Sequence, residues 1–204
     1  MIDCGDTITS HAERLCALKD RQQAWRNLEW KTIVDVDIQG PCTAYELVGG
    51  VFAKTNGRDM FFAWLPSAKS PGYTIHHEDV KMHLRDFAID PTQDLIVLLE
   101  EDYTYAIILT HYPSLIYQLS VFQYDWSRNV RLHLRTMSTM ERHPKAQSPE
   151  LRFSIRHRIN TAFVQIASNV LAVFLTLGFQ TRLILWNWEA DQLLTVCVAI
   201  TKPF

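Results

Sequence analysis

The amino-acid sequence predicts a mainly β chain of about three four-stranded antiparallel units, preceded by one N-terminal helix. Two observations lead to this fold class. A hairpin of two apolar strands spans residues 86–100, and looser versions of it occur before and after. The hairpins begin at Thr43, Asp86 and Thr161, and the first two starts are 43 positions apart. That interval is typical of the roughly 40 to 45 residues of one propeller blade.

Composition limits the function classes. The chain has 204 residues, of which 48% are hydrophobic and 11% aromatic, so it can bury a core and does not have the composition of a disordered chain. Twenty basic and 22 acidic residues give a net charge of -2. Nucleic-acid-binding domains usually carry a basic excess, so we expect no nucleic-acid partner.

The cysteines and the N-terminus indicate the compartment. No CxxC pair or zinc spacing occurs among the four cysteines, which favours free thiols in a reducing compartment and leaves a distant disulfide open. They are Cys4, Cys16, Cys42 and Cys197. The N-terminus has no signal-peptide pattern, and no apolar stretch reaches the roughly 18 residues of a membrane span. We expect an intracellular protein, cytoplasmic or nuclear, with no membrane partner.

The N-terminal helix is predicted to start at Ser10, because Ser10 and Glu13 have the spacing of a capping box. It should run to about residue 28. An apolar stripe follows one side of this helix and consists of Leu15, Leu18, Trp25 and Leu28. The stripe either docks on the following sheet or binds a partner.

Alternating apolar and polar residues after the helix predict a strand over residues 33–38, which Gly40 and Pro41 end. Three short strands should follow, at residues 45–48, 51–54 and 60–65. The pairs Gly49-Gly50 and Asn56-Gly57 separate them, and the second pair is a strong hairpin signal. Residues 66–73 are rich in Pro, Ser and Gly, which predicts a loop.

The hairpin over residues 86–100 is the clearest element. Pro91 presets φ for its turn, and Asp90 and Asp94 can accept hydrogen bonds from nearby backbone amides. The second strand, residues 95–99, is apolar on both faces. Both faces must therefore be covered by other parts of the protein.

Strands are also predicted throughout the C-terminal half, at residues 130–138, 153–155, 162–166, 170–176, 182–188 and 193–200, with a turn at 189–192. The start of the third unit at Thr161 lies 75 positions after Asp86, which is less than two blades. We interpret this as one blade with insertions at residues 103–126 and 140–149. Deleting the polar loop 140–149 should spare folding and change partner choice.

A tryptophan ends the third strand of two units, at Trp64 and at Trp188. This position gives WD repeats their name, although the His and Asp residues of the full signature are missing here. The sequence therefore predicts a partial WD-like β-propeller.

Six stretches in colinear order carry a more specific resemblance. They are residues 24–30 (AWRNLEW), 44–54 (AYELVGGVFAK), 64–67 (WLPS), 86–100, 133–139 (HLRTMST) and 185–188 (LWNW). On these stretches the chain resembles the F-box proteins of mushroom-forming fungi that have a divergent WD-like C-terminal propeller, over about residues 7 to 198.

In that family an F-box precedes the tryptophan-bearing helix and binds the Skp adaptor of a cullin-type ubiquitin ligase, and the propeller is taken to recruit a substrate. The resemblance implies a helical arm over residues 1–31 and a partial propeller over residues 32–204. It implies a non-catalytic protein-interaction module of a ubiquitin-ligase complex, with an unknown protein substrate as partner. The F-box is missing from this chain, so the Skp adaptor and a cullin are expected partners only if one lies upstream. About three blades is also fewer than the roughly four to eight of closed propellers.

No residue is assigned to catalysis, to a cofactor or to a metal. His76, His77, Asp79 and His83 resemble a metal cluster, but the six-residue spacing of His77 and His83 fits no ligand pattern and favours a solvated loop. No phosphate loop or nucleophile elbow occurs. Residues 152–158 alternate arginine with other residues, which favours a strand with one wet face over a phosphate contact.

Two alternatives stay open: a β-propeller hydrolase, or a truncated non-functional fragment of an F-box protein. A hydrolase would need a carboxylate with a raised pKa in a cleft. Carboxylates that fall at strand ends and turns, where capping and solvation explain them, are Asp35, Asp37, Asp90, Asp94, Glu100, Glu101 and Asp102.

Overall fold

The computed structural model describes residues 10–29, 33–38, 40–67, 70–100, 128–155 and 159–200. The chain divides into two compact units, Met1–Gln39 and Gly40–Phe204. The expectation of separate domains over residues 1–31 and 32–204 stays a prediction.

The first unit contains α1 (His11–Asn27), which begins at the predicted capping box. The Ser10 hydroxyl accepts from the Glu13 amide at 3.3 Å, and the Glu13 carboxylate accepts from the Ser10 amide at 2.7 Å. Leu28 ends the helix in the left-handed conformation, with φ 54°. No residue of α1 is buried, and the side chains of its apolar stripe are exposed. No helix in the described ranges is long and apolar enough to cross a membrane.

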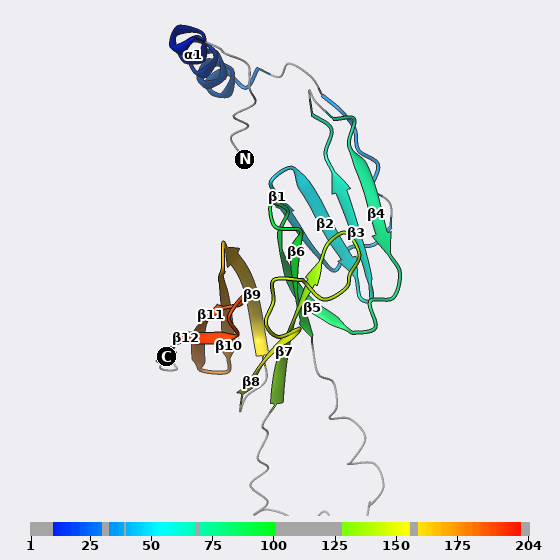
Figure 1. Ribbon diagram of the computed structural model, residues 1–204, viewed down its shortest axis with the longest axis vertical. Coiled ribbons are helices and arrows are strands. Elements are labelled where there is room, and N and C mark those ends of the chain that lie inside the picture. Colours follow the sequence, from blue (N-terminus) through cyan, green and yellow to red (C-terminus); the bar gives the residue numbers. More distant parts are fainter. Residues whose placement is uncertain are drawn as a thin grey trace, which may run out of the picture. The chain divides into compact units, whose positions relative to one another are not determined.

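The described residues of the second unit form three four-stranded antiparallel sheets, none of them closed (Figure 1). The first contains β1 (Ala44–Val48), β2 (Val51–Asn56), β3 (Asp59–Trp64) and β4 (Tyr73–His77). The second contains β5 (Leu84–Asp90), β6 (Leu95–Glu100), β7 (Arg128–Thr136) and β8 (Glu150–Ile155). The third contains β9 (Ile159–Ala167), β10 (Val170–Leu177), β11 (Gln180–Asn187) and β12 (Gln192–Ile200).

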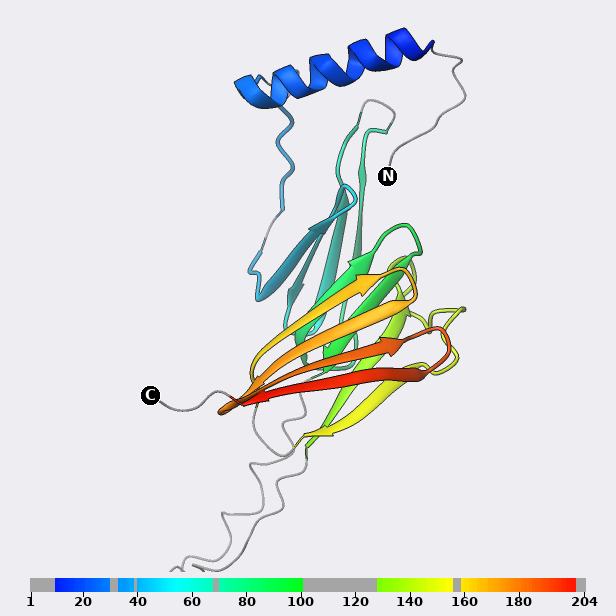
Figure 2. The ribbon, with the colours of Figure 1, turned by 90° about the vertical axis from the view of Figure 1, so that its left-hand side faces the viewer.

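Strand order within every sheet follows the chain, so each strand pairs with the next one along. Neighbouring sheets contact each other through their first strands, β1 with β5 and β5 with β9. Figure 2 looks onto the third sheet, with the second sheet behind it. Sheets that meet through their first strands are arranged as propeller blades meet around an axis. The chain is thus mainly β, a partial WD-like β-propeller with one helix before it, as the sequence predicts.

The hydrophobic core lies between the sheets, on the two faces of β6. Leu95, Val97 and Leu99 face the third sheet, whereas Ile96 and Leu98 face the first, and all five side chains are fully buried. This confirms the prediction that both faces of residues 95–99 are covered. The turn before β6 also has the predicted chemistry, since the Asp90 carboxylate accepts from the Thr92 amide at 3.0 Å.

Two secondary-structure predictions are wrong. Residues 33–38 form no strand, because alternation alone cannot make a strand that no neighbour pairs with. Tyr73 was predicted to end a loop, and His76 and His77 to lie in another, but all three belong to β4, which pairs with β3. The expected insertion at residues 103–126 lies outside the described residues.

Candidate functional site

The first strands of the first two sheets carry two carboxylates, Glu46 on β1 and Asp86 on β5. Alternation along β1 directs Glu46 to the face that packs on the second sheet, in line with Ala53 and Phe62. Its Oε2 accepts a hydrogen bond from the Ile89 amide on β5 at 2.7 Å. Burial raises the pKa of Glu46 to about 7, against the Ile89 hydrogen bond and with help from the Asp86 charge.

Asp86 repeats this arrangement one sheet further along. Burial raises the pKa of Asp86, against hydrogen bonds from the backbone amides of Phe87 and Val164. Val164 lies on β9, the first strand of the third sheet. Each carboxylate therefore joins its own sheet to the backbone of the next one. We call Glu46 and Asp86 the inner-strand carboxylates.

A carboxyl group that keeps its proton near neutral pH can donate it to a leaving group, which is the general-acid half of a two-carboxylate hydrolase. Glu46, with a pKa raised to about 7, meets this requirement, and the pKa of Asp86 is raised in the same direction. Their hydrogen bonds to Ile89 and Val164 also give them a structural role, since they satisfy amides at the junctions between sheets.

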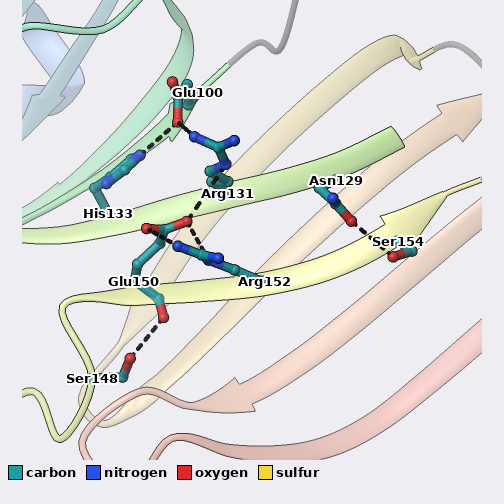
Figure 3. Close-up of polar contacts among 8 residues, drawn as sticks. All are labelled: Glu100, Asn129, Arg131, His133, Ser148, Glu150, Arg152 and Ser154. Atoms are coloured by element: carbon teal, nitrogen blue, oxygen red, sulfur yellow. Dashed lines mark hydrogen bonds and ion pairs between the residues drawn. The ribbon is translucent and has the colours of Figure 1, made fainter. Parts of the chain in front are cut away.

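A second group of charges lies on β6, β7 and β8 of the middle sheet (Figure 3). Glu100 Oε2 lies 2.9 Å from His133 Nε2 and 3.4 Å from an Arg131 guanidinium nitrogen. Glu150 accepts from Arg152 Nε at 2.7 Å, and Arg131 reaches it at 3.7 Å. Arg131 thus contacts both carboxylates, and the five side chains form one ionic network.

The network holds the Glu150 carboxylate in the charged form. Burial raises the pKa of Glu150, but the Arg152 hydrogen bond and the neighbouring positive charges lower it more, so the net shift is downward. Figure 3 also shows the Asn129 and Ser154 side chains in contact on the adjacent strands, 3.0 Å apart. A carboxylate of lowered pKa suits anion–cation pairing and does not suit a general acid.

The loop between β7 and β8 contacts the third sheet. His143 is buried, accepts from the Lys145 amide through Nδ1 and so donates from Nε2 to the Gln93 carbonyl at 2.9 Å. Its ring lies edge-on to Trp188, with centroids 5.1 Å apart. Trp188 Nε1 and Gln93 Nε2 both donate to the Ser168 carbonyl, at 2.9 and 3.0 Å. Loop, turn and third sheet are therefore joined around Trp188.

The residues that resemble a metal cluster in the sequence have separate partners in the structure. His77 Nε2 lies 2.9 Å from the Met137 carbonyl, and the His76 ring lies against Phe61. Asp79 forms an ion pair with Arg58 at 2.6 Å. No group of three or more possible metal ligands is found among the described residues.

Two of the other carboxylates named from the sequence accept hydrogen bonds from backbone amides. Asp90 caps its own turn, and Asp94 accepts from the Ser138 amide at 3.0 Å. Glu100 belongs to the ionic network. Asp35 and Asp37 lie in a stretch without regular structure, and Glu101 and Asp102 lie outside the described residues. Arg152 lies on β8, and residues 156–158 of the basic stretch are also outside the described residues.

Sequence reasoning missed Glu46 and His143. Glu46 contacts a residue 43 positions away, and His143 one 50 positions away. A polar residue between apolar neighbours, as in Tyr45-Glu46-Leu47, is the only local signal for the first. The loop around His143 gives none.

No protein-family model matches this chain, and neither the curated proteins nor the solved structures include a match.

Proposed function

We propose that the chain is a non-catalytic protein-interaction module, similar to the substrate-recruiting part of a cullin-type ubiquitin-ligase F-box protein. The observation that supports this proposal is the exposed apolar stripe of α1. All four of its side chains are exposed, and they are Leu15, Leu18, Trp25 and Leu28. Apolar anchors on one side of a helix are what a partner's groove binds.

The proposed partner is an intracellular protein. The Skp adaptor and a cullin would join the complex only through an F-box upstream of this chain. A nucleic-acid or membrane partner is not part of the proposal, since the net charge is -2.

Affinity purification of the tagged full-length protein from its source cells tests this function. We expect the Skp adaptor, a cullin and a recruited substrate to copurify with the wild type. The double substitution Leu18→Asp/Trp25→Asp should lose the protein that binds α1. The control Gln23→Asp introduces one negative charge on the opposite side of the helix and should keep that protein.

Equal recovery of every copurifying protein with the stripe variant and the wild type would contradict the role of α1. Absence of the Skp adaptor and of any cullin from the wild-type sample would contradict the ubiquitin-ligase assignment.

The raised pKa of Glu46 favours a β-propeller hydrolase as the second candidate function. Chromogenic glycosides and esters incubated with the purified chain between pH 5 and 8 would test it. This function requires a turnover that Glu46→Gln abolishes and that Glu141→Gln, a change at an exposed carboxylate, does not. Product release that is unaffected by Glu46→Gln would point to a contaminant.

A further inference from the structure

The two junctions between sheets follow one rule of register. Position is counted back from the residue that closes each first hairpin, which is Val48 in β1, Asp90 in β5 and Ala167 in β9. Glu46 lies two positions before Val48, and it accepts a hydrogen bond from the amide of Ile89, which lies one position before Asp90. Asp86 lies four positions before Asp90, and it accepts a hydrogen bond from the amide of Val164, which lies three positions before Ala167. In both junctions the acceptor is one position further from the hairpin than the donor.

The third sheet carries the same kind of face on its far side. Counting two positions before Ala167 places Gln165 at the register of Glu46, on the face of β9 turned away from the second sheet. Figure 2 looks onto this face. Phe163, Phe174 and Leu183 form one row across it, and Phe163 is 57% exposed. We call this surface the forward face of the third sheet.

The first sheet carries the complementary face. Tyr45 and Leu47 occupy the registers of Phe87 and Ile89 in the second sheet. Phe87 and Ile89 are only 4% and 3% exposed, because the first sheet covers them. Tyr45 and Leu47 are 73% and 60% exposed. We call the surface of Tyr45, Leu47, Phe52 and Phe61 the backward face of the first sheet.

We propose that a second copy of this chain covers both surfaces, so that the forward face of each third sheet packs on the backward face of the other copy's first sheet. This contact continues the junctions already present between the three sheets, with the same register and the same apolar chemistry. Gln165 Oε1 then accepts a hydrogen bond from the Leu47 amide of the second copy. Gln165 lies two positions before its hairpin's closing residue and Leu47 one position before, as in the junction between Glu46 and Ile89. In an antiparallel pair, every second backbone amide points away from the partner strand. Leu47 and Ile89 both lie one position before the residue that closes the hairpin, so the Leu47 amide points away from β2 as the Ile89 amide points away from β6.

Closure selects two copies. The contact joins two different surfaces, so it is heterologous, and such contacts form a ring when the rotation closes. Two copies of three sheets give six blades, within the roughly four to eight of closed propellers, whereas one copy gives too few and three copies too many. Both exposed aromatic faces would then be buried, as large apolar patches on proteins usually are.

Sedimentation equilibrium of the wild-type 204-residue chain tests the proposal directly. We expect a species of about 47 kDa, twice the 23.7 kDa of one chain. A mass of 23.7 kDa at micromolar concentration would overturn the proposal without any variant. So would a mass above that of two copies.

Two variants test which surfaces are used. Tyr45→Asp/Leu47→Asp blocks the backward face, and Phe163→Asp/Phe174→Asp blocks the forward face. Each should raise the dissociation constant of the dimer at least about tenfold, because buried apolar anchors dominate such contacts. The matched control is Ile200→Asp, which changes an exposed residue on the opposite face of the third sheet and should leave the dimer intact.

Mixing the two blocked variants separates the ring from other dimers. One of them keeps an intact forward face and the other an intact backward face, so a mixed pair retains one unaltered contact. Each variant alone has a blocked surface at both contacts, so the mixture should dimerise more tightly than either variant alone. A dimer that only one variant disrupts uses one surface twice and would contradict the proposal. Circular dichroism and a cooperative melt establish that each variant is folded before its mass is interpreted.

Discussion

β6 and β12 are both rich in apolar residues, yet β6 is buried along Leu95–Leu99 and β12 is exposed along its whole length. β6 lies inside the middle sheet, with another sheet on each of its faces. β12 is the last strand of the third sheet, and among the described strands it pairs with β11 alone. The comparison teaches that the place of a strand in the array of sheets decides its burial, since the composition of the two strands is similar.

Matched truncations should give the largest contrast. Leu98→Ala opens a cavity in a fully buried site and should cost about 2–5 kcal/mol of unfolding free energy. Leu193→Ala, on the exposed β12, should cost less than about 1 kcal/mol. Urea denaturation of both variants measures the two values, and similar costs would contradict the comparison.

The loop between β7 and β8 extends the comparison to a segment outside the strands. His143→Ala removes a donor to the Gln93 carbonyl and an edge contact to Trp188, and should cost about 2–3 kcal/mol. The control His76→Ala changes an exposed histidine and should cost less than about 1 kcal/mol. Thermal melts of the two variants compare them directly.

Burial in this loop reverses an expectation from the sequence. His143 and Ala146 are both buried, so deleting residues 140–149 should destabilise the protein. An unchanged melting temperature in the deletion variant would restore the prediction that the loop is dispensable.

Protonation of Glu46 should make stability depend on pH at the first junction. The pKa is about 7 in the folded chain and 4.5 ordinarily, so between these values the folded state binds a proton that the unfolded state releases. The stabilising contribution of the Glu46 proton is thus fully present below pH 4.5 and is lost as pH rises through 7. Because Glu46 is only half buried, we expect a loss of about 1–2 kcal/mol.

Glu46→Gln should therefore match the wild type at pH 4.5 and exceed it in stability at pH 8, while Asp86 keeps a residual slope of the same sign. Glu141→Gln serves as the control at an exposed carboxylate. Denaturation at the two pH values measures the difference, and a wild type that is more stable at pH 8 than at pH 4.5 would argue against this sign.

The helix cap should give the smallest effect, because it is local and independent of the sheets. Ser10→Ala removes the acceptor of the Glu13 amide and should destabilise α1 by about 1 kcal/mol. Hydrogen exchange of the Glu13 amide measures the loss, and Ser10→Thr should keep most of the protection. Unchanged exchange in Ser10→Ala would show that the cap contributes nothing.

Sequence predicted the parts of this fold whose signals are local. Gly49 and Gly50 both adopt positive φ, at 58° and 80°, and they form the predicted turn between β1 and β2. The unbroken apolar run over residues 95–99 predicted that both faces of this strand are buried. β4 was missed because it follows a Pro-rich loop and carries His76 and His77, and only pairing with β3 makes it a strand.

The candidate sites could not be predicted in the same way. Glu46, Asp86 and His143 acquire their roles from backbone groups on other sheets or turns, and no spacing along the chain records such contacts. The ionic network is partly local, since Glu150 and Arg152 lie on one strand. Its link to Glu100 through Arg131 depends on the register of β6 with β7.

Native-state hydrogen exchange across β6 and β12 tests most directly whether position in the array decides burial. We expect the β6 amides to exchange only through global unfolding and the β12 amides to exchange through smaller openings, with a free energy at least about 2 kcal/mol lower. Equal protection in the two strands would contradict the account, because β12 would then be as firmly held as the strand between two sheets.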